Sequence, residues 1–519
     1  MLTVDLVRRG AARHATRTAV VCGDQSLTFG EVDAAANRIA HVLAGLGVAR
    51  GGRVGLLIGN GLWSVPVDFG CVKAGAVRVP LNVRLAADEQ ARMLAATGVR
   101  LLVHDVAQAG RAAELASRLD GLVLASLGPA PQADALDLLA EMARASAADP
   151  RVPAAASDPV LVIYTSGTTG VLKAVVHTQA SWAAITANVL ANLVSPGRDS
   201  VMLHAASLIH ASGTFVLPYW LRGGCAAVLP GFDPQTYLDD VARYRATEIN
   251  LVPTMLGMLV TSGAAERADV SRLRTAFYGA SPMPRPVLEQ ALGLWGHRLV
   301  QYYGQTEAPL AIAVLDADDH RDPSLLGTCG HPSVDAEVAV TSQDGTPVAA
   351  GEVGEVRVRA PFGMAGYHEA PGLNAETITA DGWIRTRDLA RTDDRGYLTL
   401  VDRSSDMIIT GGYNVYPREV EEALLGHPAV TGAAVVGAPD DTWVEAVTAF
   451  VTLHPGVSTS EDELRQAVRT RLAGYKVPKT VRVVDAIPVS PVGKVLRRAL
   501  RDPLWPPGPA AGPGTGRPG

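Results

Sequence analysis

The sequence predicts an α/β protein: a large N-terminal domain of parallel-sheet α/β layers with a β-rich subdomain, followed by a small α+β C-terminal domain. Strand and helix signals alternate over the first hundred residues and again from 160 to about 315, which indicates parallel sheets covered by helices. Short strand signals separated by glycine turns fill about 327–400. With 519 residues, of which 48% are hydrophobic, the chain has apolar material for several cores and is not globally disordered.

The first hundred residues carry distinct signals for individual elements. Thr28 and Glu31 have the spacing of a capping box, and apolar residues at helical spacing follow them. Residues 54–58 and 76–79 are predicted strands, and 88–97 is a predicted helix. This order is typical of strand–helix–strand units.

Later segments define the predicted domain boundaries. Residues 106–158 are rich in alanine, and we expect one or two helices and a connector there, without chemistry. Residues 415–500 return to mixed helix and strand signals. The predicted division is 1–403 for the N-terminal domain, 404–502 for the C-terminal domain and 503–519 for a disordered Pro/Gly tail.

Charge and composition exclude several classes of protein. The net charge of -6, from 46 basic and 52 acidic residues, is unlike that of proteins that follow nucleic-acid phosphates. No signal-peptide core is visible, and no run approaches the ~18 apolar residues of a membrane span. The four cysteines are far apart, without metal-ligand spacing. We expect a cytoplasmic protein that binds neither nucleic acid nor membrane; the sequence leaves open whether it is a monomer or a homodimer.

The segment 160–177, VLVIYTSGTTGVLKAVVH, joins two strand-like runs through small and hydroxyl residues. Glycines let the backbone approach a ligand, and hydroxyls, amides and Lys173 can bind phosphate oxygens. Lys173 stands out because only five of the 46 basic residues are lysines. A Walker A loop is excluded, since two residues separate Gly170 from Lys173 and a strand follows. A plain hairpin turn is the alternative interpretation.

Residues 301–308, QYYGQTEA, place a tyrosine, a glycine turn, a hydroxyl and a carboxylate close together. Tyr303 can stack on a flat base and Thr306 can bind a phosphate. Glu307 can hold Mg²⁺, which prefers oxygen ligands. Taken alone, a surface turn explains the same residues.

The stretch 382–422 adds further polar candidates. Asp388 is a candidate for ribose hydroxyls, and Arg403 for the same ribose or its phosphate. Pro417 predicts the first turn of a helix, and the acidic residues of 419–422 fit a solvated helix face.

Near the end of the chain, 487–500 (IPVSPVGKVLRRAL) places Lys494 after a glycine in a proline-bounded loop. In isolation, a solvated loop lysine is the simpler interpretation. Its position after the three preceding motifs favours a functional role for this lysine.

Together these motifs resemble those of the adenylate-forming superfamily, which includes acyl-CoA synthetases, luciferases and peptide-synthetase adenylation domains. The chain is most similar to the acid–CoA ligase branch. YTSGTTGxxK, YGxTE, GGxNVYPxEVE and PxxxxGKxxRR occur in the family's order, and the resemblance spans Thr28 to Leu500. It implies a mobile C-terminal domain that begins near residue 405 and swings over a domain holding ATP and the acid.

The resemblance also implies a role for each motif residue. The catalytic residues would be Thr306 at the α-phosphate, Glu307 on Mg²⁺, and Lys494 between the carboxylate and the α-phosphate. The other ATP-binding residues surround the nucleotide from its phosphates to its base. They would be Thr165, Ser166, Gly167, Thr168, Thr169, Gly170, Lys173, Gly279, Ala280, Ser281, Tyr303, Asp388 and Arg403.

The implied reaction joins a small-molecule carboxylic acid to coenzyme A. The acid displaces pyrophosphate from ATP to form acyl-AMP, and the thiol of coenzyme A then releases AMP. Preorganised cations offset the charge that builds on phosphate oxygens. The alternative keeps adenylation but transfers to a carrier protein or an amine, or activates nitrite for nitrogen–nitrogen bond formation. A non-catalytic descendant is disfavoured because the charged motif residues are all present.

The acid pocket is predicted around His210, which matches an aromatic-or-histidine position lining the acid channel in relatives. Ser212, Tyr278 and Tyr302 are further candidates, and a core role for the histidine is the alternative. Tyrosines favour an aryl or medium-length acid. Four positions depart from the family pattern: Leu172 replaces a proline, Tyr302 a glycine, Arg387 a glycine, and Ser405 an aspartate or lysine.

Overall fold

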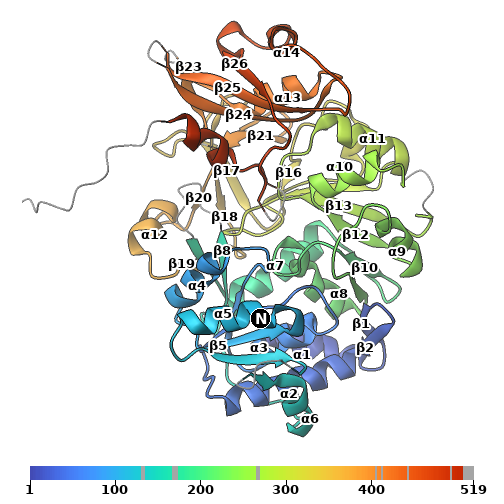
Figure 1. The fold of residues 1–519 in the computed structure, drawn as a ribbon. Helices are drawn as coiled ribbons and strands as arrows, with labels where there is room; N and C mark the ends of the chain where they lie inside the picture. Colours follow the sequence, from blue (N-terminus) through green and yellow to red (C-terminus); the bar gives the residue numbers. More distant parts are fainter. Residues whose placement is uncertain are drawn as a thin grey trace, which may run out of the picture. The chain divides into compact units, whose positions relative to one another are not determined.

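The computed structural model describes residues 1–129, 135–165, 173–264, 269–403, 406–410, 413–440, 443–490 and 494–505. The chain divides into two compact units. The N-terminal unit comprises Met1–Thr386 and Ala390–Leu400, and the C-terminal unit comprises Arg387–Leu389 and Val401–Gly519. Within each unit, helices pack on sheets (Figure 1).

One sheet of the N-terminal unit has the strand order β19-β9-β8-β4-β3-β5-β6-β7. Its parallel part runs from β8 to β7, whereas β9 and β19 are antiparallel to their neighbours. The bounds are β3 (Arg53–Leu57), β4 (Val77–Pro80), β5 (Leu101–Asp105), β6 (Val123–Leu127), β7 (Leu136–Asp137), β8 (Pro159–Thr165), β9 (Lys173–Thr178) and β19 (Gly366–Tyr367).

Helices cover both faces of this sheet. Leu56 and Leu57 are consecutive, point to opposite faces and belong to different apolar clusters. The Leu56 cluster includes residues of α2 (Phe29–Gly45), α3 (Ser64–Lys73) and α6 (Leu138–Arg144). The Leu57 cluster includes residues of α4 (Ala87–Ala96) and α5 (Ala109–Arg118).

The second sheet has the order β16-β15-β14-β13-β12-β10-β11-β1-β2. Strands from β14 to β1 are parallel, and β2, β15 and β16 are antiparallel additions. The bounds are β1 (Thr18–Cys22), β2 (Gln25–Thr28), β10 (Val201–His204), β11 (Cys225–Val228), β12 (Glu248–Leu251), β13 (Thr275–Gly279), β14 (Leu299–Tyr303), β15 (Ala313–Leu315) and β16 (His331–Pro332).

Three apolar clusters support the second sheet. One contains residues of α9 (Tyr237–Arg243), α10 (Pro253–Thr261) and α11 (Arg285–Trp295). Another contains residues of α7 (Gln179–Asn192) and the β-rich segment, and a third those of α1 (Thr3–His14) and α8 (Val216–Arg222).

The β-rich sheet has the order β17-β18-β20-β21, and α12 (Pro371–Thr377) precedes its third strand. The strands are β17 (Glu337–Thr341), β18 (Gly354–Arg359), β20 (Ile384–Thr392) and β21 (Leu398–Arg403). Its last two strands contribute residues to both units.

The C-terminal unit has its own apolar core, built from its sheet and two helices. The sheet order is β23-β22-β25-β24, with β26 paired to β25. Its elements are β22 (Ile408–Thr410), β23 (Tyr413–Val415), α13 (Pro417–Leu425), β24 (Val430–Asp440), β25 (Val444–Leu453), α14 (Glu461–Arg469), β26 (Thr480–Val483) and α15 (Arg497–Arg501).

The predicted α/β class, with parallel sheets and a smaller C-terminal domain, is confirmed. The capping box is present: the Glu31 N–H donates to Thr28 Oγ1 (3.2 Å), and the Thr28 N–H donates to Glu31 (2.7 Å). The helices expected within 106–158 are present as α5 and α6, but the interpretation missed the strands β6 and β7, which lie there too. Residues of β6 such as Ala125 and Ser126 are small and fully buried. The segment therefore lacks the run of β-branched and aromatic residues that usually predicts a strand.

No helix in the described residues is long and apolar enough to span a membrane. The cysteines Cys22, Cys71, Cys225 and Cys329 are free thiols. Among the described side chains, no group of three or more His, Cys, Asp and Glu residues forms a metal cluster.

Candidate active site

The hairpin of β8 and β9 carries the first predicted motif. Thr165 and Lys173 are register partners at the end where β8 finishes and β9 begins. The ammonium group of Lys173 lies 5.7 Å from the ring centroid of Tyr367. Ser166, Gly167, Thr168, Thr169 and Gly170, together with Leu172, lie outside the described residues.

Tyr367 connects this hairpin to the second motif. Its hydroxyl donates a hydrogen bond of 2.7 Å to Glu307 Oε1. The ring is buried, and its strand β19 pairs with β9 in the register Tyr367↔Val175. The backbone also holds Glu307, since the Met364 N–H donates to its carbonyl oxygen (2.8 Å). Lys173, Tyr367 and Glu307 therefore form a continuous chain of contacts.

His177 fixes the backbone immediately before Glu307. Its Nε2 lies 2.8 Å from the carbonyl oxygen of Thr306, which can only accept, so Nε2 carries the proton. Complete burial lowers the pKa of His177 to about 4, which keeps the ring neutral near pH 7. Thr306 is thus held by His177 of β9, and Glu307 by Tyr367 of the adjacent strand β19. Sequence analysis missed His177 and Tyr367 because neither contact has a local sequence signal.

The adenine candidates lie at the carboxyl ends of neighbouring parallel strands. β13 ends at Gly279 and β14 at Tyr303, and Gly279 is the register partner of Tyr302. A side chain at Gly279 would meet the carbonyl oxygen and ring of Tyr302, so only glycine fits. Ala280 then turns with a φ of 69°. Carboxyl ends of parallel strands are the usual ligand-binding edge of such sheets.

Two of the acid-pocket candidates come from the turn after β10. His210 immediately precedes the 3₁₀ turn Ala211–Phe215 and is half-buried. The hydroxyl of Ser212 lies 2.9 Å from Nδ1 of His204, the last residue of β10. Burial lowers the pKa of His204 to about 3, so a neutral imidazole stands behind this turn. Sequence analysis did not single out His204.

The two tyrosine candidates are in the core. The Tyr302 hydroxyl donates to Asn250 Oδ1 (3.0 Å), whereas the Tyr278 hydroxyl lies 2.8 Å from His320 Nε2. Tyr278 pairs in register with Gln301, so Tyr278 and Tyr302 point to opposite faces of the sheet. The structure therefore does not bring these two candidates together.

The C-terminal unit contains the other predicted residues. Arg403 Nε lies 3.1 Å from Asp388 Oδ1, which pairs the two ribose candidates. Arg387, in place of the family's glycine, has the left-handed φ of 62° that favours glycine. Lys494 is exposed, and its backbone N–H donates to Ser490 Oγ (3.1 Å). Ser405 lies outside the described residues.

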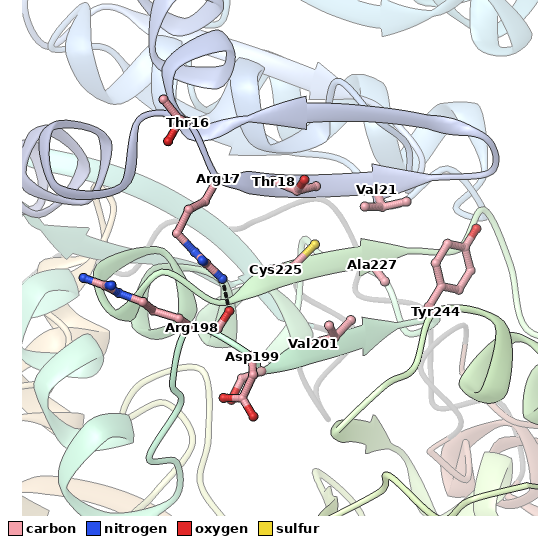
Figure 2. Close-up of a pocket in the computed structure, with 11 residues that line it drawn as sticks. Thr16, Arg17, Thr18, Val21, Arg198, Asp199, Val201, Cys225, Ala227 and Tyr244 are labelled. Carbon is pink, nitrogen blue, oxygen red and sulfur yellow. Dashed lines mark hydrogen bonds between the residues drawn. The ribbon is translucent and has the colours of Figure 1, made fainter.

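A cavity of about 600 Å³ in the N-terminal unit lies away from these groups (Figure 2). It is at the amino-terminal ends of β1, β10 and β11, where Arg17 donates to the carbonyl oxygen of Arg198. None of the predicted site residues is among its lining residues. We therefore do not assign this cavity to the active site.

Comparisons with known proteins identify the family of the chain. The family model described as AMP-binding enzyme matches residues 7–368, and that described as AMP-binding enzyme C-terminal domain matches 419–494. The medium/long-chain-fatty-acid–CoA ligase FadD8 of Mycobacterium tuberculosis is 36% identical, over 95% of this chain and 88% of its own length. A feruloyl-CoA synthase of Amycolatopsis sp is 38% identical, over 93% of this chain and 95% of its own.

Among solved structures, the amide bond synthetase McbA of Marinactinospora thermotolerans superposes with a TM-score of 0.89 at 32% identity. The match covers 97% of this chain and 100% of McbA. The two family models match parts of both units, and the relatives cover more than nine tenths of the chain. The chain therefore belongs to the AMP-binding enzyme family.

Proposed function

We propose that the protein is an ATP-dependent carboxylic acid–CoA ligase that forms acyl-AMP, then a CoA thioester, and releases AMP and pyrophosphate. The contact chain of Lys173, Tyr367 and Glu307 carries this proposal. A cation and a carboxylate contact the same tyrosine, and a magnesium–nucleotide is bound by groups of these two kinds.

The residues present fit a magnesium ion. Mg²⁺ usually keeps several waters and takes one or two protein carboxylates together with substrate phosphates. Glu307 supplies one half-buried carboxylate, and Tyr367 fixes its orientation. When bound, the ion would neutralise phosphate charge. Lys173 would bind the β- and γ-phosphates, and Thr306 the α-phosphate.

The other predicted contacts hold the nucleoside. Asp388 would accept hydrogen bonds from ribose hydroxyls, and Arg403 would orient it through their ion pair. Gly279, Ala280 and Ser281 would contact adenine, and Tyr303 would stack on it. A fixed nucleotide leaves the α-phosphorus oriented toward the attacking carboxylate.

Lys494 would complete the adenylation step. Its ammonium group would bridge the acid's carboxylate and the α-phosphate, where negative charge increases as pyrophosphate leaves. Movement of the C-terminal unit would bring the lysine in, exclude water from the anhydride, and later withdraw it so that the thiol of CoA can attack the carbonyl. The free thiols and the ATP and CoA requirements fit the cytoplasm.

A second candidate is adenylation followed by transfer to a different acceptor. Similarity to the amide bond synthetase McbA, and to a Streptomyces coeruleorubidus ligase named for an acyl-carrier-protein acceptor, favours keeping it. Both candidates share the first half-reaction and differ only in the nucleophile.

The experiment that tests the proposal has two stages. ATP–pyrophosphate exchange is measured across a panel of aryl, short, medium and long carboxylic acids. The product formed from each active acid is then identified by mass spectrometry with CoA, with amines and without either. Acid-dependent exchange with a CoA thioester product supports the proposal, whereas formation of ADP, or an amide in preference to a thioester, contradicts it.

A further inference from the structure

Arg497 lies three residues after Lys494, at the start of α15, and is mostly buried. Its Nε and Nη2 donate to the two carboxylate oxygens of Glu421 in α13, at 3.1 and 2.8 Å. Its Nη1 donates to Asp406 Oδ2 at 3.0 Å. One guanidinium thus joins α15 both to α13 and to the segment that enters β22.

A third carboxylate stands behind this contact. Asp402, at the end of β21, has 3% of its side chain exposed and lies 3.9 Å from Arg497 Nη1. It also accepts backbone N–H groups of Arg403 (2.8 Å) and Arg418 (3.0 Å). Arg497 is therefore surrounded by acidic groups from three separate parts of the C-terminal unit.

The interpretation of the acidic residues 419–422 as a solvated face is wrong for Glu421. Glu421 is 8% exposed and also accepts the backbone N–H of Val435 at 2.9 Å. Burial raises the pKa of Asp402 to about 6, and the charge of Arg497 opposes that rise. Removal of Arg497 would leave buried carboxylates uncompensated, which is costly.

The chain on the other side of Lys494 is also held. The Ser490 N–H donates to the Lys494 carbonyl oxygen (2.6 Å), and the Leu496 N–H to that of Pro488 (2.8 Å). Val489 and Val495 form an antiparallel bridge. Residues 488–490 and 494–496 are therefore paired with each other. On the carboxyl side, the fork of Arg497 attaches α15 to α13 and Asp406, and the Trp505 indole N–H donates to the Gly437 carbonyl oxygen of β24 (3.0 Å).

We propose that Arg497 is a positioning residue for adenylate formation, which holds the Lys494 loop to Glu421, Asp406 and Asp402 so that the lysine moves with the C-terminal unit as one body. This inference rests on the proposed function, because it concerns the residue that delivers Lys494. A guanidinium suits the task, since its planar fork can bind several carboxylate oxygens in fixed directions.

The test compares Arg497→Gln and Arg497→Lys with Arg498→Gln in the full chain. Arg498 is the matched control, because it is in the same helix but half-exposed and pairs only locally with Asp502, at 2.8 Å. Each variant is assayed for ATP–pyrophosphate exchange and, separately, for thioester formation from supplied acyl-AMP. Hydrogen–deuterium exchange compares 494–505 with β24 and β25.

We expect Arg497→Gln to lower pyrophosphate exchange about 100-fold, as displacement of a catalytic group by about 1 Å does. The exchange rate of Arg497→Lys should lie between those of Arg497→Gln and the native enzyme, because an ammonium group keeps the charge but lacks the planar fork of the guanidinium. Thioester formation from acyl-AMP should be largely kept. Deuterium uptake should rise in 494–505 and stay low in β24 and β25, and Arg498→Gln should behave as native.

Native exchange rates in Arg497→Gln would overturn the inference. So would equal loss of both half-reactions with raised uptake throughout β24 and β25, since Arg497 would then only stabilise the fold. If Arg497→Gln does not fold, Glu421→Gln takes its place, with the same selective loss expected in smaller degree. Lys494→Ala separates the two proposals: if that variant keeps full exchange, the role of Lys494 itself fails, whatever Arg497 does.

Discussion

The two units position their charged groups by different means. In the N-terminal unit, Glu307 and Lys173 depend on strand ends, a tyrosine hydroxyl and a neutral buried histidine, His177. In the C-terminal unit, Lys494 is on a loop attached through the charged side chain of Arg497. The first arrangement is set when the large sheets pack. The second depends on ion pairs at the edge of a smaller core.

Under the proposed function, the difference follows from what each group has to do. Strands of a large sheet that pack against apolar clusters give fixed directions to the residues at their ends. A residue that moves with the smaller unit is not oriented by the large sheets. Buried ion pairs with several hydrogen bonds can orient it instead, although burying their charges costs desolvation free energy. The comparison therefore predicts that the two units respond differently to mutation and to pH.

The largest effect should come from Lys494→Ala. Loss of the ammonium group removes charge stabilisation at the α-phosphate, so adenylate formation should fall by about 10²–10³-fold or more. Thioester formation from supplied acyl-AMP should be nearly unchanged. Pyrophosphate exchange and a single-turnover thioester assay measure the two steps separately; equal losses in both would contradict the division of labour between the units.

The next effect concerns Glu307 and its support. Glu307→Gln should shift the Mg²⁺ dependence of turnover to higher concentration, and Tyr367→Phe should do so more weakly, by about 10-fold, because it removes only the orienting hydroxyl. The matched control is Tyr397→Phe, which loses a similar 2.7 Å bond to Asp319 elsewhere in the N-terminal unit. An identical Mg²⁺ titration curve for Glu307→Gln would remove this residue from the metal site.

His204 in the N-terminal unit and Asp402 in the C-terminal unit should contribute to stability with opposite pH dependence. The pKa of His204 is about 3 when folded and ~6.5 unfolded, so its contribution is lost as pH falls below ~6.5. The pKa of Asp402 is about 6 when folded and ~4 unfolded, so its contribution is lost as pH rises from ~4 to about 6.

Variants of His204 and Asp402 measure how the contribution of each residue to the free energy of unfolding changes with pH. The free energy of unfolding of the native protein minus that of His204→Gln should increase between pH 4.5 and 6.5, by at most about 1.4 kcal/mol per pH unit. The same difference for Asp402→Asn should decrease over pH 4–6. Hydrogen exchange of β10 and β24 amides reports each unit separately. If the two differences changed with pH in the same direction, the predicted electrostatic distinction between His204 and Asp402 would be wrong.

The smallest effect should come from Arg387→Gly. Relief of the left-handed backbone at φ 62°, partly offset by the added freedom of the unfolded chain, should stabilise the protein by about 0.5–1 kcal/mol. Arg391→Gly in the same strand is the control and should destabilise, since its backbone is not left-handed. Thermal unfolding measures both; a lower midpoint for Arg387→Gly would show that its side chain outweighs the strain.

Local chemistry made much of the molecule predictable. The capping box of Thr28, the first-turn proline of α13 and the alternating strands are signals carried by neighbouring residues. Lys173 and Glu307 stood out because their motifs are short and dense. The partners that bring them together, Tyr367 and His177, could not be predicted because their contacts join residues 60 and 129 positions apart. Glu421 was misjudged for the same reason, since its partner Arg497 is 76 positions away.

The hydroxyl of Tyr367 has a consequence for how the enzyme is made. Its strand is at the edge of a sheet whose other strands end by residue 178, so the chain must be synthesised almost 190 residues further before this edge can be completed. Until then, the Glu307 carboxylate lacks the hydroxyl that hydrogen-bonds to it. The contacts that join Lys173, Tyr367 and Glu307 can therefore form only after nearly the whole N-terminal unit has been synthesised.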